Sequence, residues 1–222
     1  MAPAGGGPDT AQLRPVVLPR RNFYEPRTPE RICLVWTIPA GTPSSFRPLA
    51  SWAVDVVDAI RSRRTHKQYG SEPVDEATLR ELLDLARYAP NHHLTQPWRF
   101  RVLGPETRRL IDDLAGEKEA RKLRRAPTLV LATAALSGDP LTDEEDLHAT
   151  AAAVYAVLLG ATARGLASYW RTPACFREPS VRAVLGLAGG ERVVSLIHLG
   201  PRLSEPSVKE RLPLEEVLTL LP

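Results

Sequence analysis

Hydrophobic residues in the first half of the sequence fall into two helical stripes and one alternating run. Residues 51–64, SWAVDVVDAIRSRR, place apolar side chains at helical spacing behind a serine in the capping position. Residues 73–90 place leucines and an alanine on one stripe, so they predict a second helix that ends before Pro90. Residues 98–104, WRFRVLG, alternate apolar and polar positions, which predicts a strand with one buried face.

The middle of the sequence predicts a surface helix followed by buried elements. Residues 105–125 are amphipathic and highly charged, which is typical of one surface helix with a fraying end. Residues 128–136, TLVLATAAL, are apolar almost throughout and predict a strand buried on both faces. Thr142 and Glu145 form a capping box for a helix over residues 143–165, which is apolar on nearly every side. Such a helix belongs in the middle of the core or in a dimer interface.

The C-terminal part predicts two further strands and two short helices. The strands are residues 166–170 and 191–200, and the helices lie near residues 180–187 and at residues 213–221. Helices and strands are mixed without a strict βαβ rhythm. This arrangement favours an α+β fold with helices packed on a sheet.

Residues 1–50 differ from the rest of the sequence. They contain nine of the 21 prolines, a run of three glycines and only one short apolar patch. Such a composition cannot build a core of its own. We expect a disordered or wrapping extension there, or residues that precede a start codon assigned too far upstream, and one principal domain over residues 51–222.

Composition and charge limit the functional classes. The 222 residues carry a net charge of +3, and the dispersed arginines lack interleaved aromatics, so nucleic-acid binding is disfavoured. No apolar run reaches the ~20 residues that span a bilayer, and the N-terminus lacks the apolar core of a secretory signal. Cys33 and Cys175 lie far apart, which favours reduced thiols over a structural disulfide. These features predict a soluble, cytoplasmic protein that binds neither nucleic acid nor membrane.

Two segments carry candidate chemistry. The sequence has no GxGxxG after a strand, no GxxxxGK[ST], no HExxH and no GxSxG. Its five histidines show no metal spacing, and His92 and His93 would point in opposite directions on an extended segment, so no metal site is expected. Residues 61–67, RSRRTHK, are either the cationic end of a helix or a phosphate-binding cluster. Residues 88–100, YAPNHHLTQPWRF, are either a plain connection or a wall of a binding site.

Together, two separated groups of motifs resemble the FMN-dependent nitroreductase family. RSRRTHKQY, the leucine-rich helix and YAPNHHLTQPWRF are similar to the first half of its members. GLASYWRTPAC followed by EPSVRAVLGLAGGERVVSLIHLG is similar to the second half. The likeness covers residues 54–200 and is strongest to the branch of small NAD(P)H nitroreductases. It implies a homodimer with a central, mostly antiparallel sheet flanked by helices and with FMN at the subunit interface.

The resemblance also implies which positions contact FMN. Arg63, Arg64 and Thr65 match positions that hold the phosphate and the ribityl chain. Lys67 matches the position of a base near the N1 and O2 edge of the flavin, where a cation stabilises the negative charge that develops on reduction. Some members have a further phosphate contact near the C-terminus. The resemblance does not decide which of three residues here matches it: Arg202, Lys209 or Arg211.

Other matching positions line the flavin ring. Four match an interfacial wall: Tyr88, Pro90, Asn91 and His92. Of these, Tyr88 and His92 match positions that contact FMN from the partner subunit. Three match the segment along the other side of the flavin: Trp170, Arg171 and Thr172. Core packing for Trp170 and an exposed loop position for His92 are the alternatives. Leu94 stands where many members carry an asparagine that reaches the flavin or the substrate.

The implied activity is that of an NAD(P)H oxidoreductase. Hydride passes from NADH or NADPH through flavin N5 to a small electrophilic acceptor such as a nitroaromatic compound or a quinone, in a ping-pong sequence. Because the cofactor performs the electron transfer, no catalytic acid or base is expected. The alternative is an FMN-binding redox sensor or flavin reservoir without fast nicotinamide turnover. Flavin fragmentation and reductive dehalogenation are further options, and the sequence shows no distinctive feature for either.

Overall fold

The computed structural model describes residues 54–187 and 189–221. The predicted extension over residues 1–50, the start of the domain at residue 51 and Cys33 lie outside these residues. Within them, Cys175 is a buried free thiol.

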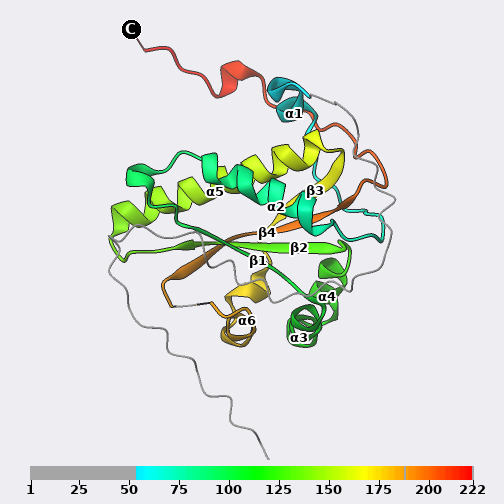
Figure 1. The fold of residues 1–222 in the computed structure, drawn as a ribbon. Coiled ribbons are helices and arrows are strands. Elements are labelled where there is room, and N and C mark those ends of the chain that lie inside the picture. Colours follow the sequence, from blue (N-terminus) through cyan, green and yellow to red (C-terminus); the bar gives the residue numbers. More distant parts are fainter. Residues whose placement is uncertain (1–53, 188, 222) are drawn as a thin grey trace, which may run out of the picture. The chain divides into compact units, whose positions relative to one another are not determined.

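A four-stranded antiparallel sheet forms the centre of the described residues (Figure 1). Its strands are β1 (Trp98–Val102), β2 (Thr128–Ala135), β3 (Leu166–Arg171) and β4 (Glu191–Pro201). The order is β1-β2-β4-β3, and every neighbouring pair is antiparallel. The central position of β2 explains why its sequence is apolar almost throughout, because helices cover both of its faces. The predicted α+β fold and its strands are confirmed.

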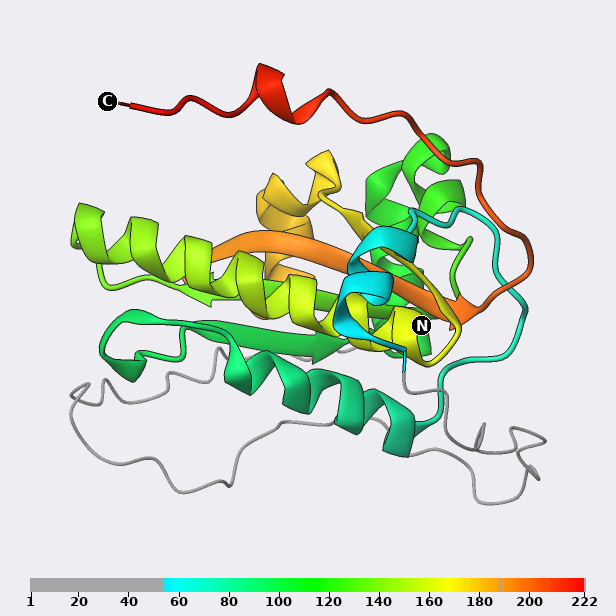
Figure 2. The same ribbon diagram turned by 90° about the horizontal axis from the view of Figure 1, so that it is seen from above.

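Three helices lie on one face of the sheet. The long helix α5 (Pro140–Ala163) crosses this face, and α2 (Glu76–Asp84) runs beside it and continues as the 3-10 turn η1 (Leu85–Tyr88) (Figure 2). Helix α1 (Val56–Ser62) contacts α5. By length and composition α5 is apolar enough to cross a membrane, but 56% of its most apolar stretch is buried inside the protein, as in a core helix.

The core on this face depends on a close approach between α5 and η1. Leu82, Val154 and Ile197 are fully buried there. A Cβ atom added to Gly160 of α5 would lie 2.3 Å from Leu85 Cδ1. A glycine at this position therefore lets the two backbones approach each other.

The opposite face is covered by α3 (Pro105–Ala115), α4 (Glu117–Leu123) and α6 (Pro179–Val184), together with the 3-10 turn η3 (Ala174–Arg177). The prediction of one helix over residues 105–125 is wrong. Gly116 has a φ of 74°, which ends α3 and lets α4 start in a new direction.

Two predicted helix starts are also wrong. The cap of α1 is Asp55, whose carboxylate accepts from Val57 N at 2.8 Å, and Ser51 lies outside the described residues. Helix α5 begins before the expected capping box, because Asp139 caps it and Pro140 occupies the first helical position. Thr142 therefore lies inside the helix and donates to Asp139.

The predicted closing helix over residues 213–221 is wrong as well. This segment contains only the 3-10 turn η4 (Leu214–Glu216). Leu214, Val217 and Leu218 remain exposed, so no packing surface of the described residues stabilises a longer helix.

Candidate functional site

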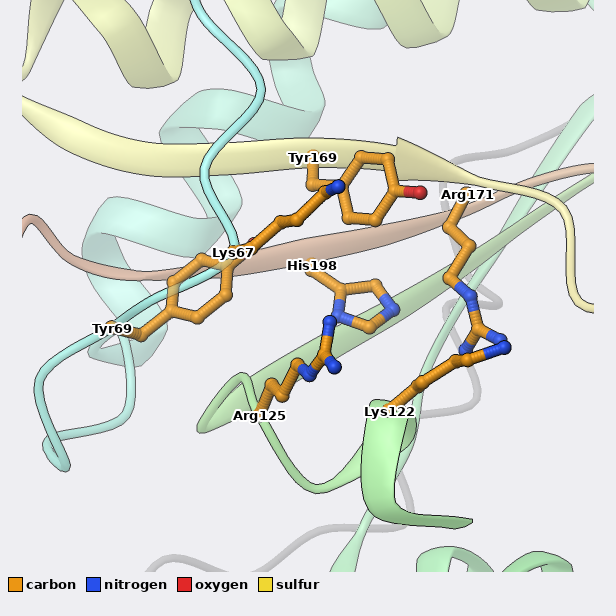
Figure 3. A pocket seen from close by; sticks show the side chains of 7 residues that line it. All are labelled: Lys67, Tyr69, Lys122, Arg125, Tyr169, Arg171 and His198. Atoms are coloured by element: carbon orange, nitrogen blue, oxygen red, sulfur yellow. The ribbon is translucent and has the colours of Figure 1, made fainter. Parts of the chain in front are cut away.

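A cavity of about 160 Å³ lies on the face of the sheet that carries α3, α4 and α6. It is lined by four cationic side chains, two tyrosines and a histidine: Lys67, Lys122, Arg125, Arg171, Tyr69, Tyr169 and His198. Figure 3 shows that these side chains come from the segment after α1, from α4 and the turn after it, and from β3 and β4.

Strand alternation selects the residues that the sheet contributes. Tyr169 and Arg171 are two positions apart on β3, so both side chains face the cavity. Trp170, between them, points to the other face and packs against the core beneath α5. On β4, His198 faces the cavity in the same way, while Ile197 faces that core.

Hydrogen bonds fix the segment that carries Lys67 beside the sheet. His66 N donates to the Ser168 carbonyl of β3 at 3.0 Å. The Tyr69 hydroxyl donates to the His66 carbonyl at 2.7 Å, and Gly70 N donates to the Pro201 carbonyl of β4 at 3.0 Å. These contacts place Lys67 beside the cavity although it is distant from β3 and β4 in the sequence.

One carboxylate partly balances the charge of the cavity. Glu119 of α4 accepts from Lys122 at 2.6 Å and also pairs with Arg171, whose side chain is only 10% exposed. The hydrogen bond from Lys122 and the charge of Arg171 hold the pKa of Glu119 below its usual range. Within the described residues, Lys67 and Arg125 have no ion-pair partner. The cavity is therefore suited to an anion or a group rich in acceptors.

His198 adds a neutral polar group. Burial, followed by the charge of Arg171, lowers its pKa from 6.5 to about 3, so the ring is uncharged at neutral pH. The ring centroid of Tyr169 lies 5.6 Å away. His198 Nε2 and Arg171 Nη1 are buried and make no hydrogen bond to any described residue. Both atoms remain free to bind a ligand.

The residues of the basic cluster after α1 differ in whether their side chains are hydrogen-bonded. Arg64 donates to the carbonyls of Arg61 and Arg63, the latter at 3.0 Å, so its guanidinium caps the end of α1. The side chains of Arg63 and Thr65 have no hydrogen-bond partner among the described residues. A backbone bridge between Tyr69 and Arg202 brings Arg202 next to this segment.

The other two candidates for a phosphate contact lie farther along the chain. Lys209 and Arg211 belong to the exposed C-terminal segment, where no ion pair with another described residue holds them. Arg202 itself pairs with Glu205 at 2.6 Å.

The segment over residues 88–96 has an unusual backbone. His93, Leu94 and Gln96 have φ angles of 51°, 52° and 45°, in the left-handed region that disfavours such side chains. Asn91 stabilises this turn, because its Oδ1 accepts from Gln96 N at 2.9 Å and its Nδ2 donates to the Ala89 carbonyl at 3.0 Å. Strain of this kind is concentrated at functional sites.

The same backbone turn corrects the expected direction of the paired histidines. The rings of His92 and His93 stack at a centroid distance of 3.9 Å instead of pointing apart. No group of three or more metal-binding side chains occurs among residues 54–187 and 189–221.

The sequence-predicted residues thus form two groups in one chain. Lys67 and Arg171 meet in the cavity, and Thr172 follows β3 at the exposed surface. The segment with the exposed residues Tyr88, Pro90 and His92, and with the half-buried Asn91, contacts α5 on the opposite face of the sheet. Sequence reasoning did not identify five cavity residues: Tyr69, Lys122, Arg125, Tyr169 and His198. The alternation of β3 would have identified Tyr169 from Arg171.

Comparisons with known proteins show the family to which this sequence is similar. The model of the Nitroreductase family matches residues 60–122 and 114–201. The "Putative NAD(P)H nitroreductase YfhC" of Bacillus subtilis is 29% identical over 178 residues, which cover 73% of this chain and 92% of that protein.

Solved structures share the fold. A nitroreductase-like family protein from Bacillus cereus superposes with a TM-score of 0.71 at 24% identity, covering 77% of this chain and 98% of the other. A "putative nitroreductase in complex with fmn" from Desulfovibrio desulfuricans superposes with a TM-score of 0.64 at 26% identity, covering 75% of this chain and 96% of the other.

Proposed function

Because the chain belongs to the nitroreductase family, we propose that it is an FMN-dependent oxidoreductase that transfers hydride from NADH or NADPH to a small electron acceptor. A nitroaromatic compound or a quinone is the expected class of acceptor, and a ping-pong sequence the expected kinetic order. The observation that carries the proposal is the meeting of Lys67 and Arg171, which come from two distant motifs, in one cationic cavity.

The residues of the cavity fit FMN. The cofactor carries an anionic phosphate and a ring edge with several hydrogen-bond acceptors, and four cations line the cavity. Arg171 Nη1 is a buried donor without a partner among the described residues, so it can donate to that edge. His198 Nε2 can take either role, depending on the tautomer of the neutral ring.

Each group of residues then has a distinct task. Lys67 and Arg171 would hold the flavin ring, where positive charge favours reduction. Arg63 and Thr65 bind the phosphate, since their side chains are not committed to other described residues. When bound, FMN supplies the hydride chemistry at N5. The protein positions the ring, and no side chain is required to transfer a proton.

We propose that the active form is a homodimer that shares its flavin sites. The cavity and the segment with Tyr88 and His92 lie on opposite faces of the sheet, so one chain cannot bring both to the same flavin. A second copy can supply the segment to the cavity of the first. Exposed apolar residues at both ends of the described chain support such a contact: Val56, Val57, Ile60, Val208, Leu212 and Leu214.

The first test is the visible spectrum of the purified, desalted protein, with the released chromophore identified by chromatography. We expect about one FMN per chain, as the proposed site implies. Oxidation of NADH and NADPH with and without an added quinone then separates a turnover enzyme from a redox sensor or flavin reservoir. A colourless protein that takes up no added FMN would contradict the proposed function.

A further inference from the structure

Glu119 contacts two of the four cations that line the cavity. It lies in the first turn of α4 and accepts from Lys122, one turn later, at 2.6 Å. Its other carboxylate oxygen pairs with Nη2 of Arg171 on β3. The Glu119 side chain is 23% exposed and that of Arg171 is 10% exposed, so this pair is only weakly screened by solvent.

No other carboxylate of the described residues forms an ion pair with the four cations that line the cavity. Glu119 therefore offsets part of the positive charge that the cavity presents. A lowered pKa, caused first by the hydrogen bond from Lys122, keeps Glu119 ionised at neutral pH.

The pairing also orients Arg171. Its Nη2 is held by Glu119, while its Nη1 is buried and unpaired within the described residues. A guanidinium is planar, so fixing one nitrogen fixes the direction of the other. Through this pairing, Glu119 orients the Nη1 donor of Arg171 at the cavity. It also offsets part of the positive charge of the guanidinium.

We propose that Glu119 is a positioning residue that sets the reduction potential of the bound flavin by offsetting the charges of Lys122 and Arg171. This inference rests on the proposed function, because it assumes that FMN occupies the cavity. Positive charge near the ring favours the reduced flavin. Removal of the carboxylate should therefore make bound FMN easier to reduce, and removal of Lys122 should make it harder to reduce.

A purely structural role is the competing explanation, since Glu119 also ties α4 to β3. The two explanations differ in what they change. A structural tie affects thermal stability, while an electrostatic role moves the potential of the bound flavin in a direction set by the sign of the removed charge. The charge-conserving variant Glu119→Asp should then keep the potential of the unmodified protein.

The experiment measures the midpoint potential of bound FMN by equilibration with a reference dye. Glu119→Gln should shift the equilibrium toward reduced FMN by roughly tenfold, which is about 30 mV for a two-electron couple. Lys122→Gln should shift it the opposite way. The matched control is Glu117→Gln on the same helix, because Glu117 is 76% exposed and pairs with Arg124 outside the cavity. That control should leave the potential unchanged.

The outcomes separate this inference from the function on which it rests. Stoichiometric FMN with equal potentials in all variants overturns the role of Glu119 and leaves the proposed function intact. Loss of FMN in Glu119→Gln alone also overturns it, because Glu119 would then be required to bind FMN and would not act by setting its potential. Failure of the unmodified protein to bind FMN overturns the proposed function and this inference with it.

Discussion

His92 Nδ1 lies 2.8 Å from a carboxylate oxygen of Glu145, so a residue of the strained segment is tied to the second turn of α5. One position farther along α5, Asp146 accepts from the Thr95 hydroxyl at 2.6 Å. Two contacts from successive helix positions hold the segment over residues 88–96 against α5 and away from the cavity on the other face of the sheet. This separation suggests a test of whether two chains build one site.

We predict that two defective variants complement each other. Arg171→Ala removes a cavity residue and His92→Ala removes a wall residue, and each variant alone should lose most of its NADH oxidation. In co-expressed mixtures, mixed dimers contain one site with both residues intact, so roughly a quarter of the sites should recover. The measurement is quinone-dependent NADH oxidation per chain. Activity no greater than that of the separate variants would show that both residues act in the same chain.

A second prediction concerns Arg63 and Thr65, whose side chains have no hydrogen-bond partner among the described residues. Replacing Arg63 and Thr65 together by alanine should weaken FMN binding at least about tenfold, because charge-assisted hydrogen bonds to the phosphate are lost. The quantity to measure is the FMN retained after dialysis and the dissociation constant on re-addition. The adjacent double variant Arg61→Ala with Ser62→Ala is the control, since both residues are exposed in the last turn of α1. Unchanged retention in the first variant would exclude the phosphate assignment.

The fold was largely predictable because the spacing of apolar residues within a segment indicates whether it is a helix or a strand and which of its faces is buried. The alternating run at Trp98–Val102 and the apolar run at Thr128–Ala135 form strands, as predicted. The errors lie at the boundaries of helices, where a single residue determines the position at which the helix starts or ends. Gly116 ends α3 through a backbone conformation that sequence periodicity does not report, and Asp139 takes the capping role expected of Thr142.

The site was less predictable because it depends on which elements meet. Lys67 and Arg171 belong to recognisable motifs, but Lys122 and Glu119 were assigned to a charged surface helix. Their place at the cavity follows from the break at Gly116 and from the packing of α4 near β3. Periodicity within a segment describes which residues share a face and does not describe what that face contacts.

Close packing around Gly160 gives a prediction about stability. Gly160→Ala should lower the free energy of unfolding by about 1–3 kcal/mol, because the added Cβ would meet Leu85 at 2.3 Å and Leu82 at 3.1 Å. Urea denaturation followed by circular dichroism measures this change. Gly189→Ala is the matched control, because a Cβ there meets nothing within 4 Å. Equal effects of the two substitutions would show that α5 and η1 are not in close contact.

His198 gives a prediction about pH. Its pKa is lowered from 6.5 to about 3, chiefly by burial, so the unfolded chain takes up a proton in this range while the folded chain does not. Stability therefore falls as the pH decreases below 6.5 and continues to fall until the pH reaches about 3. A decrease from pH 7 to pH 5 should therefore lower the free energy of unfolding by about 2 kcal/mol through this one group.

The variant His198→Gln isolates this effect, because glutamine keeps a polar side chain and does not titrate. We expect the unfolding free energy of the unmodified protein to decrease more than that of the variant from pH 7 to pH 5, by about the same 2 kcal/mol. Both proteins should be measured without added FMN, since a bound cofactor would itself contribute to stability. Parallel pH profiles would mean that His198 is protonated in the folded protein, and Arg171 and Arg125 would then face a charged ring.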